Sequence, residues 1–322
     1  MCIRDSNHTG PLSWSKSNSK IYFTSNRSTS WEYEFRNSEI YSVGVNDKKI
    51  NSLTDRKGPD FSPKESPNGK YIAYLGFADR VQAYQNTELL IMDSNGKNKR
   101  VLSFNIDSSI SSFYWSSDNK GIYCTYDKFG DTKIAYINLE GTEKDLAKNL
   151  GGNSIGRPYG GGSFSVSKNG VIAYTNTSYM HPSELTVVNR KKTNQITNLS
   201  DELLKNKTLA KVEEVWYKSS FDNRDIQGWV AYPPNYNPEK EYPFLVENHG
   251  GPISNYGSRF SAEVQLFAAA GYIVFYPNPR GSTSYGEEFA NLLHHNYPAE
   301  DYLDVMDGVD FCIKNGIANP NE

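Results

Sequence analysis

The 322-residue sequence predicts a partial β-propeller, of which about four blades are visible, followed by an α/β domain. Three observations lead to this fold class. A strand-turn-strand pattern recurs about every fifty residues in the first part of the chain, which is typical of propeller blades. Beyond residue 210 the pattern changes to alternating strands and helices. A His-Gly-Gly turn then follows an apolar strand in this second region.

The repeat consists of four segments in which a polar turn precedes an alternating apolar strand. Their equivalent positions are Ile21, Ile72, Ile122 and Ile172, which are 51, 50 and 50 residues apart. A second strand-like piece that ends in a turn follows each of them. We therefore expect residues 1–210 to form propeller blades of the WD40 or TolB-like kind, with more blades in the whole ring than the four visible here.

The turns and strands of the repeat have a physical explanation. Asn and Gly in the turns tolerate the positive φ that tight hairpins require; the turns are Pro67-Asn68-Gly69, Asp118-Asn119 and Asn169-Gly170. Branched and aromatic side chains of the following strands are expected to pack between neighbouring blades. The alternative is a β-sandwich with coincidental spacing.

Residues 211–322 are predicted to be the second domain. Residues 211–236 indicate two strands around an Asn-Arg turn, and buried strands are expected at 244–246 and 272–276. Ser261 suits the cap of a helix that ends at Gly271. A last helix is expected over 298–315, with Pro298 in its first turn. Its apolar face would be Leu303, Met306, Val309 and Ile313. The order of elements predicts a largely parallel sheet covered by helices.

Composition excludes several classes of function. The net charge is −3, so nothing indicates binding to nucleic acid or to an anionic membrane. The three cysteines are far apart and lack ligand-spaced histidines, which argues against a disulfide framework and against a zinc site. No apolar run is long enough to span a bilayer. We expect neither a metal nor another cofactor.

The His249-Gly250-Gly251 turn has the composition of an oxyanion loop. In α/β-hydrolases, a backbone N–H in the loop after an early strand donates to the oxyanion, and this loop often contains His-Gly-Gly. Two glycines let the chain turn so that an amide points into the site with no side chain in the way. His249 would shape the loop by hydrogen bonding. Taken alone, the turn is equally compatible with a structural Gly-Pro turn beside a buried histidine.

Three stretches together resemble one enzyme family. They are ENHGGPISNYG from Glu247, AAAGYIVFYPNPRGSTSYGEEF from Ala268 and DYLDVMDGVDFCI from Asp301. They are similar to the prolyl oligopeptidase family of serine peptidases, family S9, particularly its acylaminoacyl-peptidase and dipeptidyl-peptidase-like branch. The resemblance implies an amino-terminal β-propeller joined to an α/β-hydrolase peptidase domain, of which residues 211–322 would be the N-terminal part.

The resemblance also assigns roles to individual residues. Gly251 matches the backbone N–H donor of the oxyanion hole, supported by His249 and Gly250. Arg280 matches an arginine that holds active-site loops together. Glu287 and Glu288 suit the start of a helix and need no catalytic role. Glu213 and Glu214 invite comparison with paired acids that grip a substrate amine in some dipeptidyl peptidases, although their place at a domain junction argues against this role.

The family mechanism requires a serine, an aspartate and a histidine, and the sequence supplies none of them in a suitable place. The Gly-x-Ser-x-Gly motif at 152–156 has no strand before it and no helix after it, so we interpret it as a false positive. We therefore expect an internal fragment that lacks its native amino terminus and is truncated before the nucleophile. The triad would lie beyond Glu322.

The predicted function is hydrolysis of peptide bonds in short peptides through an acyl-enzyme. The full-length protein would be the enzyme, while the chain as given is expected to be inactive. Two alternatives remain open: a non-catalytic propeller interaction module, and an esterase of the α/β-hydrolase class. The sequence indicates neither the substrate specificity, the oligomeric state nor the compartment.

Overall fold

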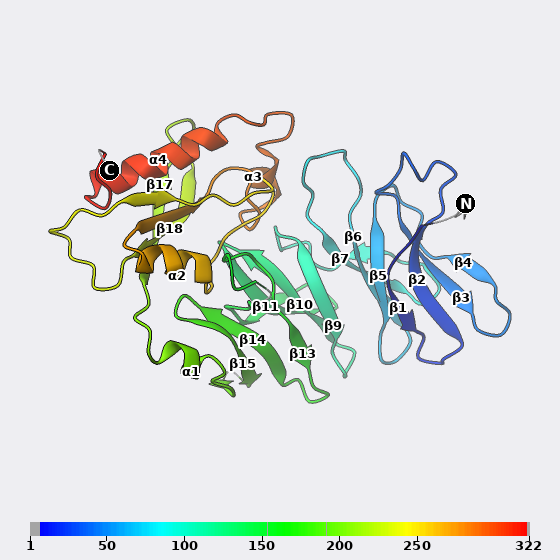
Figure 1. The fold of residues 1–322 in the computed structure, drawn as a ribbon. Helices are drawn as coiled ribbons and strands as arrows, with labels where there is room; N and C mark the ends of the chain where they lie inside the picture. Colours follow the sequence, from blue (N-terminus) through cyan, green and yellow to red (C-terminus); the bar gives the residue numbers. More distant parts are fainter. Residues whose placement is uncertain (1–6, 153, 191, 321–322) are drawn as a thin grey trace, which may run out of the picture. The chain divides into compact units, whose positions relative to one another are not determined.

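The computed structural model describes residues 7–152, 154–190 and 192–320 (Figure 1). The chain divides into two compact units. The first comprises residues 1–126, 135–145 and 168–170, and the second comprises residues 127–134, 146–167 and 171–322. The predicted domain boundary between residues 210 and 211 lies inside the second unit and stays a prediction.

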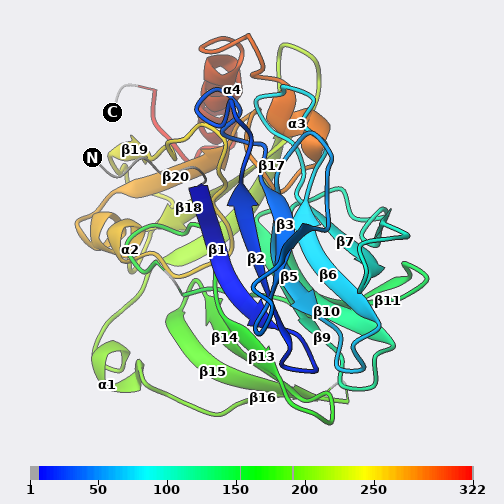
Figure 2. The ribbon, with the colours of Figure 1, turned by 90° about the vertical axis from the view of Figure 1, so that its right-hand side faces the viewer.

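Four sheets of four antiparallel strands form the first part of the chain, as expected for propeller blades (Figure 2). In chain order they are β1–β4, β5–β8, β9–β12 and β13–β16. The strands are β1 (Asn7–Trp14), β2 (Lys20–Asn26), β3 (Glu39–Gly44), β4 (Ile50–Ser52), β5 (Asp60–Glu65), β6 (Tyr71–Gly76), β7 (Glu88–Asp93), β8 (Arg100–Val101), β9 (Ile110–Trp115), β10 (Gly121–Lys128), β11 (Asp131–Asn138), β12 (Glu143–Ala147), β13 (Phe164–Val166), β14 (Ile172–Ser178), β15 (His181–Asn189) and β16 (Lys192–Gln195).

The four equivalent isoleucines occupy the same place in the four sheets. Each lies near the start of a second strand and pairs with a residue near the end of the first; the pairs are Trp14 with Ile21, Glu65 with Ile72, Trp115 with Ile122 and Val166 with Ile172. The repeat is thereby confirmed. The fourth strands had no clear signal in the sequence because they are short and polar, and all of β4 is exposed.

Two apolar cores lie between neighbouring sheets of the first unit. One joins the first and second sheets through residues such as Tyr22, Ile40 and Ile72. The other joins the second and third sheets through residues such as Leu89 and Phe113. Branched and aromatic side chains therefore pack between adjacent blades, as predicted.

The second unit contains a mixed sheet in the order β17-β18-β20-β19. Its strands are β17 (Lys211–Lys218), β18 (Asp225–Tyr232), β19 (Phe244–Val246) and β20 (Ile273–Asn278). Only β19 and β20 are parallel, whereas β18 is antiparallel to both β17 and β20. The prediction of a largely parallel sheet is therefore wrong for these strands, because the first two form a hairpin with a short turn.

Helices cover both faces of this sheet (Figure 1). The helices are α1 (Asp201–Leu204), α2 (Ala262–Ala269), α3 (Glu287–Asn291) and α4 (Asp301–Lys314). On one face α2 packs with Trp229 and Tyr276, and on the other α4 packs with Phe275. The cap of α2 is as predicted, since the Ser261 side chain accepts a hydrogen bond from Val264 N. No helix among the described residues is long and apolar enough to cross a membrane.

The last helix differs from the prediction in its start and in its buried face. It begins at Asp301 rather than at Pro298, and its fully buried residues are Asp304, Gly308 and Cys312. The predicted face is wrong for Leu303 and Met306, which are each more than a third exposed, whereas Ile313 packs against the core as predicted. The helix lies so close to the sheet that a Cβ at position 308 would be 2.4 Å from the Phe275 ring.

Candidate active-site loop

The His-Gly-Gly loop leaves the sheet at the carboxyl end of β19. Glu247 is buried and its N–H donates to the carbonyl of Phe275 in β20, over 2.8 Å. The loop returns to the same strand nine residues later, where Tyr256 N donates to Asn278 Oδ1, also over 2.8 Å. Both ends of the loop are thus tied to β20, and the glycines lie at its exposed tip.

Gly251 has a backbone conformation that favours glycine. Its φ is +142°, and a Cβ added there would lie 3.0 Å from Ile253 N. Within residues 7–152, 154–190 and 192–320, its N–H donates no hydrogen bond. Gly251 is also exposed. The amide is therefore available to an acceptor from outside the loop.

His249 is half-buried and packs edge-on against the Tyr256 ring, with 5.1 Å between ring centroids. Its Nε2 lies 3.0 Å from Ser282 Oγ and its Nδ1 lies 3.4 Å from the carbonyl oxygen of Gly250. Burial lowers the pKa of His249 to about 4. The imidazole is consequently neutral at pH 7 and has one N–H to donate, either to Ser282 or to Gly250.

The contact between His249 and Ser282 is not a catalytic pair. Ser282 is fully buried, so no substrate carbonyl reaches its hydroxyl. That hydroxyl also donates to the carbonyl of Pro279 over 2.6 Å. A histidine with a pKa of about 4 is a weak base at neutral pH. The pair thus serves to hold the loop.

The depressed pKa of His249 predicts a loss of stability in acid. The unfolded chain binds a proton at this histidine below about pH 6.5, whereas the folded chain does so only near pH 4. Stability should therefore fall as the pH is lowered from 6.5 to 4, by up to about 3 kcal/mol. The free energy of unfolding in urea should fall between pH 6.5 and pH 4 more steeply for the wild type than for His249→Gln, and the two proteins should show the same pH dependence outside this window. A constant difference from pH 4 to pH 7 would contradict the assignment.

Arg280 lies at the centre of a buried polar network that joins three elements. Its guanidinium is 2% exposed and binds Asp304 of α4, with Nε to Oδ2 at 2.8 Å and Nη2 to Oδ1 at 2.9 Å. Nη2 also donates to Ser219 Oγ over 2.8 Å and lies 3.2 Å from Asp222, both in the β17–β18 hairpin. The loop that follows β20 is thereby fixed to α4 and to the hairpin.

The loop fixed by Arg280 braces the His-Gly-Gly loop. Ser282 contacts His249, and Thr283 N donates to the carbonyl of Ser254 over 2.9 Å. The Thr283 hydroxyl also donates to Asn255 Oδ1 over 2.7 Å. Arg280 therefore acts on the candidate site through its neighbours and does not touch the glycines itself.

The segment from Ile155 to Tyr159, which we call the strap, lies against the same loop. Tyr159 forms an isolated antiparallel bridge with Tyr256. Arg157 lies 3.1 Å from Glu247 and binds Glu263 in a bidentate manner at 2.8 and 3.3 Å. Sequence reasoning missed these residues because the strap lies about ninety residues before the loop and has no regular pattern.

The Gly-x-Ser-x-Gly motif at 152–156 overlaps the start of the strap. Asn153 lies outside the described residues, but Ser154 and Gly156 are described. β12 ends at Ala147 and α1 begins only at Asp201, so no strand-turn-helix elbow surrounds Ser154. The interpretation of the motif as a false positive agrees with this arrangement.

The side chains of Glu213 and Glu214 do not point toward a common binding site. Because successive side chains of a strand point to opposite faces, these neighbours in β17 do not converge. Glu213 accepts hydrogen bonds from Lys211 and Tyr232, whereas Glu214 accepts from Trp216 and Gln227. The structure does not bring the two acids together as a clamp for an amine.

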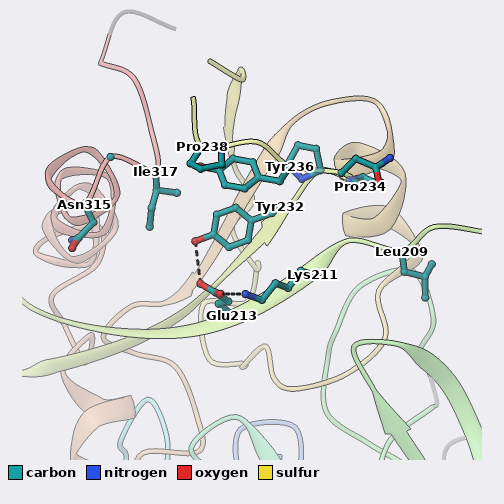
Figure 3. Close-up of a pocket in the computed structure, with 12 residues that line it drawn as sticks. Leu209, Lys211, Glu213, Tyr232, Pro234, Tyr236, Pro238, Asn315 and Ile317 are labelled. Carbon is teal, nitrogen blue, oxygen red and sulfur yellow. Dashed lines mark hydrogen bonds and ion pairs between the residues drawn. The ribbon is translucent and has the colours of Figure 1, made fainter. Parts of the chain in front are cut away.

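Glu213 instead lines a pocket of about 530 Å³ beside the end of α4 (Figure 3). Its charged lining residues, Lys211 and Glu213, pair with each other at 2.5 Å. Tyr232 and Tyr236 form its aromatic wall, with 4.8 Å between ring centroids. None of the residues of the His-Gly-Gly loop lines this pocket.

The sequence matches the model of the prolyl oligopeptidase family over residues 258–322. It is also 34% identical to the "Uncharacterized peptidase YuxL" of Bacillus subtilis over 207 residues, which are 62% of this chain and 29% of that protein. The dipeptidyl-peptidase 5 of Porphyromonas gingivalis is 28% identical over 307 residues, which are 93% of this chain and 43% of that protein. The chain belongs to the prolyl oligopeptidase family.

Solved structures share the fold of this prolyl oligopeptidase family member. The Pyrococcus horikoshii acylaminoacyl peptidase superposes with a TM-score of 0.78 at 22% identity, covering 98% of this chain and 47% of that one. A second acylaminoacyl peptidase, in complex with Z-Gly-Gly-Phe-chloromethyl ketone, gives a TM-score of 0.79 at 22% identity and covers 46% of that chain. The chain spans less than half the length of these relatives.

Proposed function

We propose that the complete protein containing this chain is a serine peptidase that hydrolyses short peptides through an acyl-enzyme. Its membership of a family of serine peptidases supports this function. The relatives are named as a dipeptidyl peptidase and acylaminoacyl peptidases, which act on peptides or on their acylated ends. In this proposal the chain supplies propeller blades and the oxyanion loop, and the Ser, Asp and His come from sequence outside it.

The observation that carries the proposal is the exposed Gly251 amide. Its N–H is left without an acceptor among the described residues, at the tip of a loop that is tied at both ends to β20. In acyl transfer, negative charge develops on the carbonyl oxygen when the nucleophile attacks. A fixed backbone N–H that faces this oxygen stabilises the transition state more than the ground state. Gly251 is the proposed donor, with His249, Gly250 and Arg280 as its support.

The proposed chemistry requires an accessible nucleophile, and neither Ser282 nor Ser154, which both lie in the described part of the chain, suits this role. Ser282 is buried, and Ser154 lacks the elbow that exposes a nucleophile. A fluorophosphonate probe, which labels reactive serines, tests whether the nucleophile lies outside this chain. The complete protein is expected to label at one serine, with loss of activity against peptide anilides, whereas this chain alone is expected not to label.

Three outcomes would contradict the proposal. Stoichiometric labelling of this chain alone would mean that a nucleophile lies within residues 1–322. A complete protein that cleaves p-nitrophenyl esters but no peptide anilide would be an esterase, and one that cleaves neither and binds no probe would be a non-catalytic module.

A further inference from the structure

The backbone torsions of Gly250 are not restricted by neighbouring atoms. A Cβ added at Gly250 would meet nothing within 4 Å, so neighbouring atoms do not limit the torsions of this residue. Glycine also has more backbone freedom than any other residue. The orientation of the Gly251 N–H therefore depends on how the peptides on either side of Gly250 are held from outside the turn.

The strap holds the first of these peptides, which joins His249 to Gly250. Gly250 N donates to the hydroxyl of Tyr159 over 3.4 Å. On the other side of the residue, the Gly250 carbonyl lies 3.4 Å from Nδ1 of His249. The single N–H of the neutral imidazole lies either on Nδ1, where it donates to this carbonyl, or on Nε2, where it donates to Ser282. Tyr159 is thus the partner of Gly250 that does not depend on the tautomer of His249.

The strap itself is firmly held. Gly257 N donates to the carbonyl of Pro158 over 3.0 Å, and the Tyr159 and Tyr256 rings pack at 5.0 Å. At the other end, the carbonyls of Ile155 and Gly156 accept from the first amides of α2, Ala262 N at 2.7 Å and Glu263 N at 3.0 Å. Arg157 adds its ion pairs with Glu247 and Glu263. The Tyr159 hydroxyl is therefore presented from a rigid backbone.

We propose that Tyr159 is a positioning residue for the oxyanion donor. It acts through Gly250, by holding the peptide that precedes the Gly251 amide, and it does not touch the reacting atoms. This inference rests on the proposed peptidase function. It assigns a role to a side chain from the segment between the third and fourth blades, about ninety residues before the loop that it serves.

The test is Tyr159→Phe, which removes the hydroxyl and keeps the ring and the backbone bridge. In the complete protein, kcat for a peptide anilide is expected to fall about fivefold with KM unchanged, because the donor is displaced while substrate binding is not. The matched control is Tyr179→Phe. The Tyr179 hydroxyl donates to Ser258 over 3.0 Å and not to the His-Gly-Gly loop. The kcat of the Tyr179→Phe variant should therefore stay at the wild-type value.

A second measurement separates this inference from the proposed function. Amide exchange at Gly250, measured by NMR on this chain, is expected to accelerate about fivefold in Tyr159→Phe and to stay unchanged in Tyr179→Phe. If the complete wild type hydrolyses no peptide, the proposed function fails while this measurement still decides the role of Tyr159. A kcat within twofold of the active wild type, or unchanged exchange at Gly250, would overturn the role of Tyr159.

Discussion

Replacing Gly251 with alanine should lower kcat of the complete protein by about a hundredfold. The φ of +142° is one that L-residues rarely adopt, and the new Cβ would lie 3.0 Å from Ile253 N. The backbone must rotate to relieve both strains, which turns the N–H away from the developing oxyanion. Loss of one oxyanion donor costs on the order of a hundredfold to a thousandfold in kcat. Hydrolysis of a peptide anilide at saturating substrate measures the effect.

Gly271→Ala is the matched control for this substitution. Gly271 follows α2, has a φ of +101°, and a Cβ there would meet nothing within 4 Å. The control therefore introduces backbone strain of about 1 kcal/mol without a change at the candidate site. Its kcat should equal that of the wild type. Equal losses of kcat in the two variants would show that strain alone, rather than the position of the Gly251 amide, explains the result.

Arg280→Met should destabilise this chain by about 3–5 kcal/mol. The substitution leaves Asp304, whose side chain is fully buried, without the guanidinium that neutralises it. It also removes the hydrogen bond to Ser219 and the ion pair to Asp222. Urea unfolding followed by circular dichroism measures the loss.

Two further variants identify the cause of this loss. In Arg280→Met with Asp304→Asn, the buried charge is gone while the side-chain oxygen can still accept from the Arg280 backbone N–H, over 2.8 Å in the wild type. This pair should regain about 1–2 kcal/mol. Lys218→Met breaks an ion pair of 2.8 Å with Asp225 whose partners are 55% and 61% exposed, and it should cost less than about 1 kcal/mol. A double variant no more stable than Arg280→Met would refute the role of the buried charge.

The blades could be predicted from sequence because each repeat places an isoleucine at the same point of its second strand, where three of the four are fully buried and Ile21 is half-buried. Ile21, Ile72, Ile122 and Ile172 all take part in the second strands of their sheets. The exposed fourth strands escaped notice because a two- to five-residue polar strand has no apolar alternation to detect. Regular burial is thus what made the repeat visible.

The last helix shows where periodicity misleads. Its apolar residues Leu303 and Met306 predicted one face, but the helix buries Asp304 and Gly308 instead. Position 304 holds an aspartate because its carboxylate neutralises the buried Arg280. Position 308 holds a glycine because the helix packs so closely on Phe275 that a side chain would not fit. Both requirements are set by tertiary contacts, so a hydrophobic pattern does not reveal them.

The candidate site could be predicted only where its residues have a local sequence signature. The glycine pair has a local signature, because a turn that exposes an amide favours glycine at both positions. The strap has none, since Arg157 and Tyr159 owe their roles to residues about ninety positions further along the chain. Asp304 is a similar case, because it is recognised only once Arg280 is seen beside it.

The carbonyls of Ile155 and Gly156 complete the first turn of α2 from more than a hundred residues upstream. During synthesis the strap leaves the ribosome before α2. At an elongation rate of about 5–20 residues per second, the helix emerges on the order of ten seconds later. Closing such a long loop is entropically costly and slows folding. The strap, which lies between the third and fourth blades, is therefore already synthesised when the first turn of α2 forms, so the order of synthesis favours their pairing.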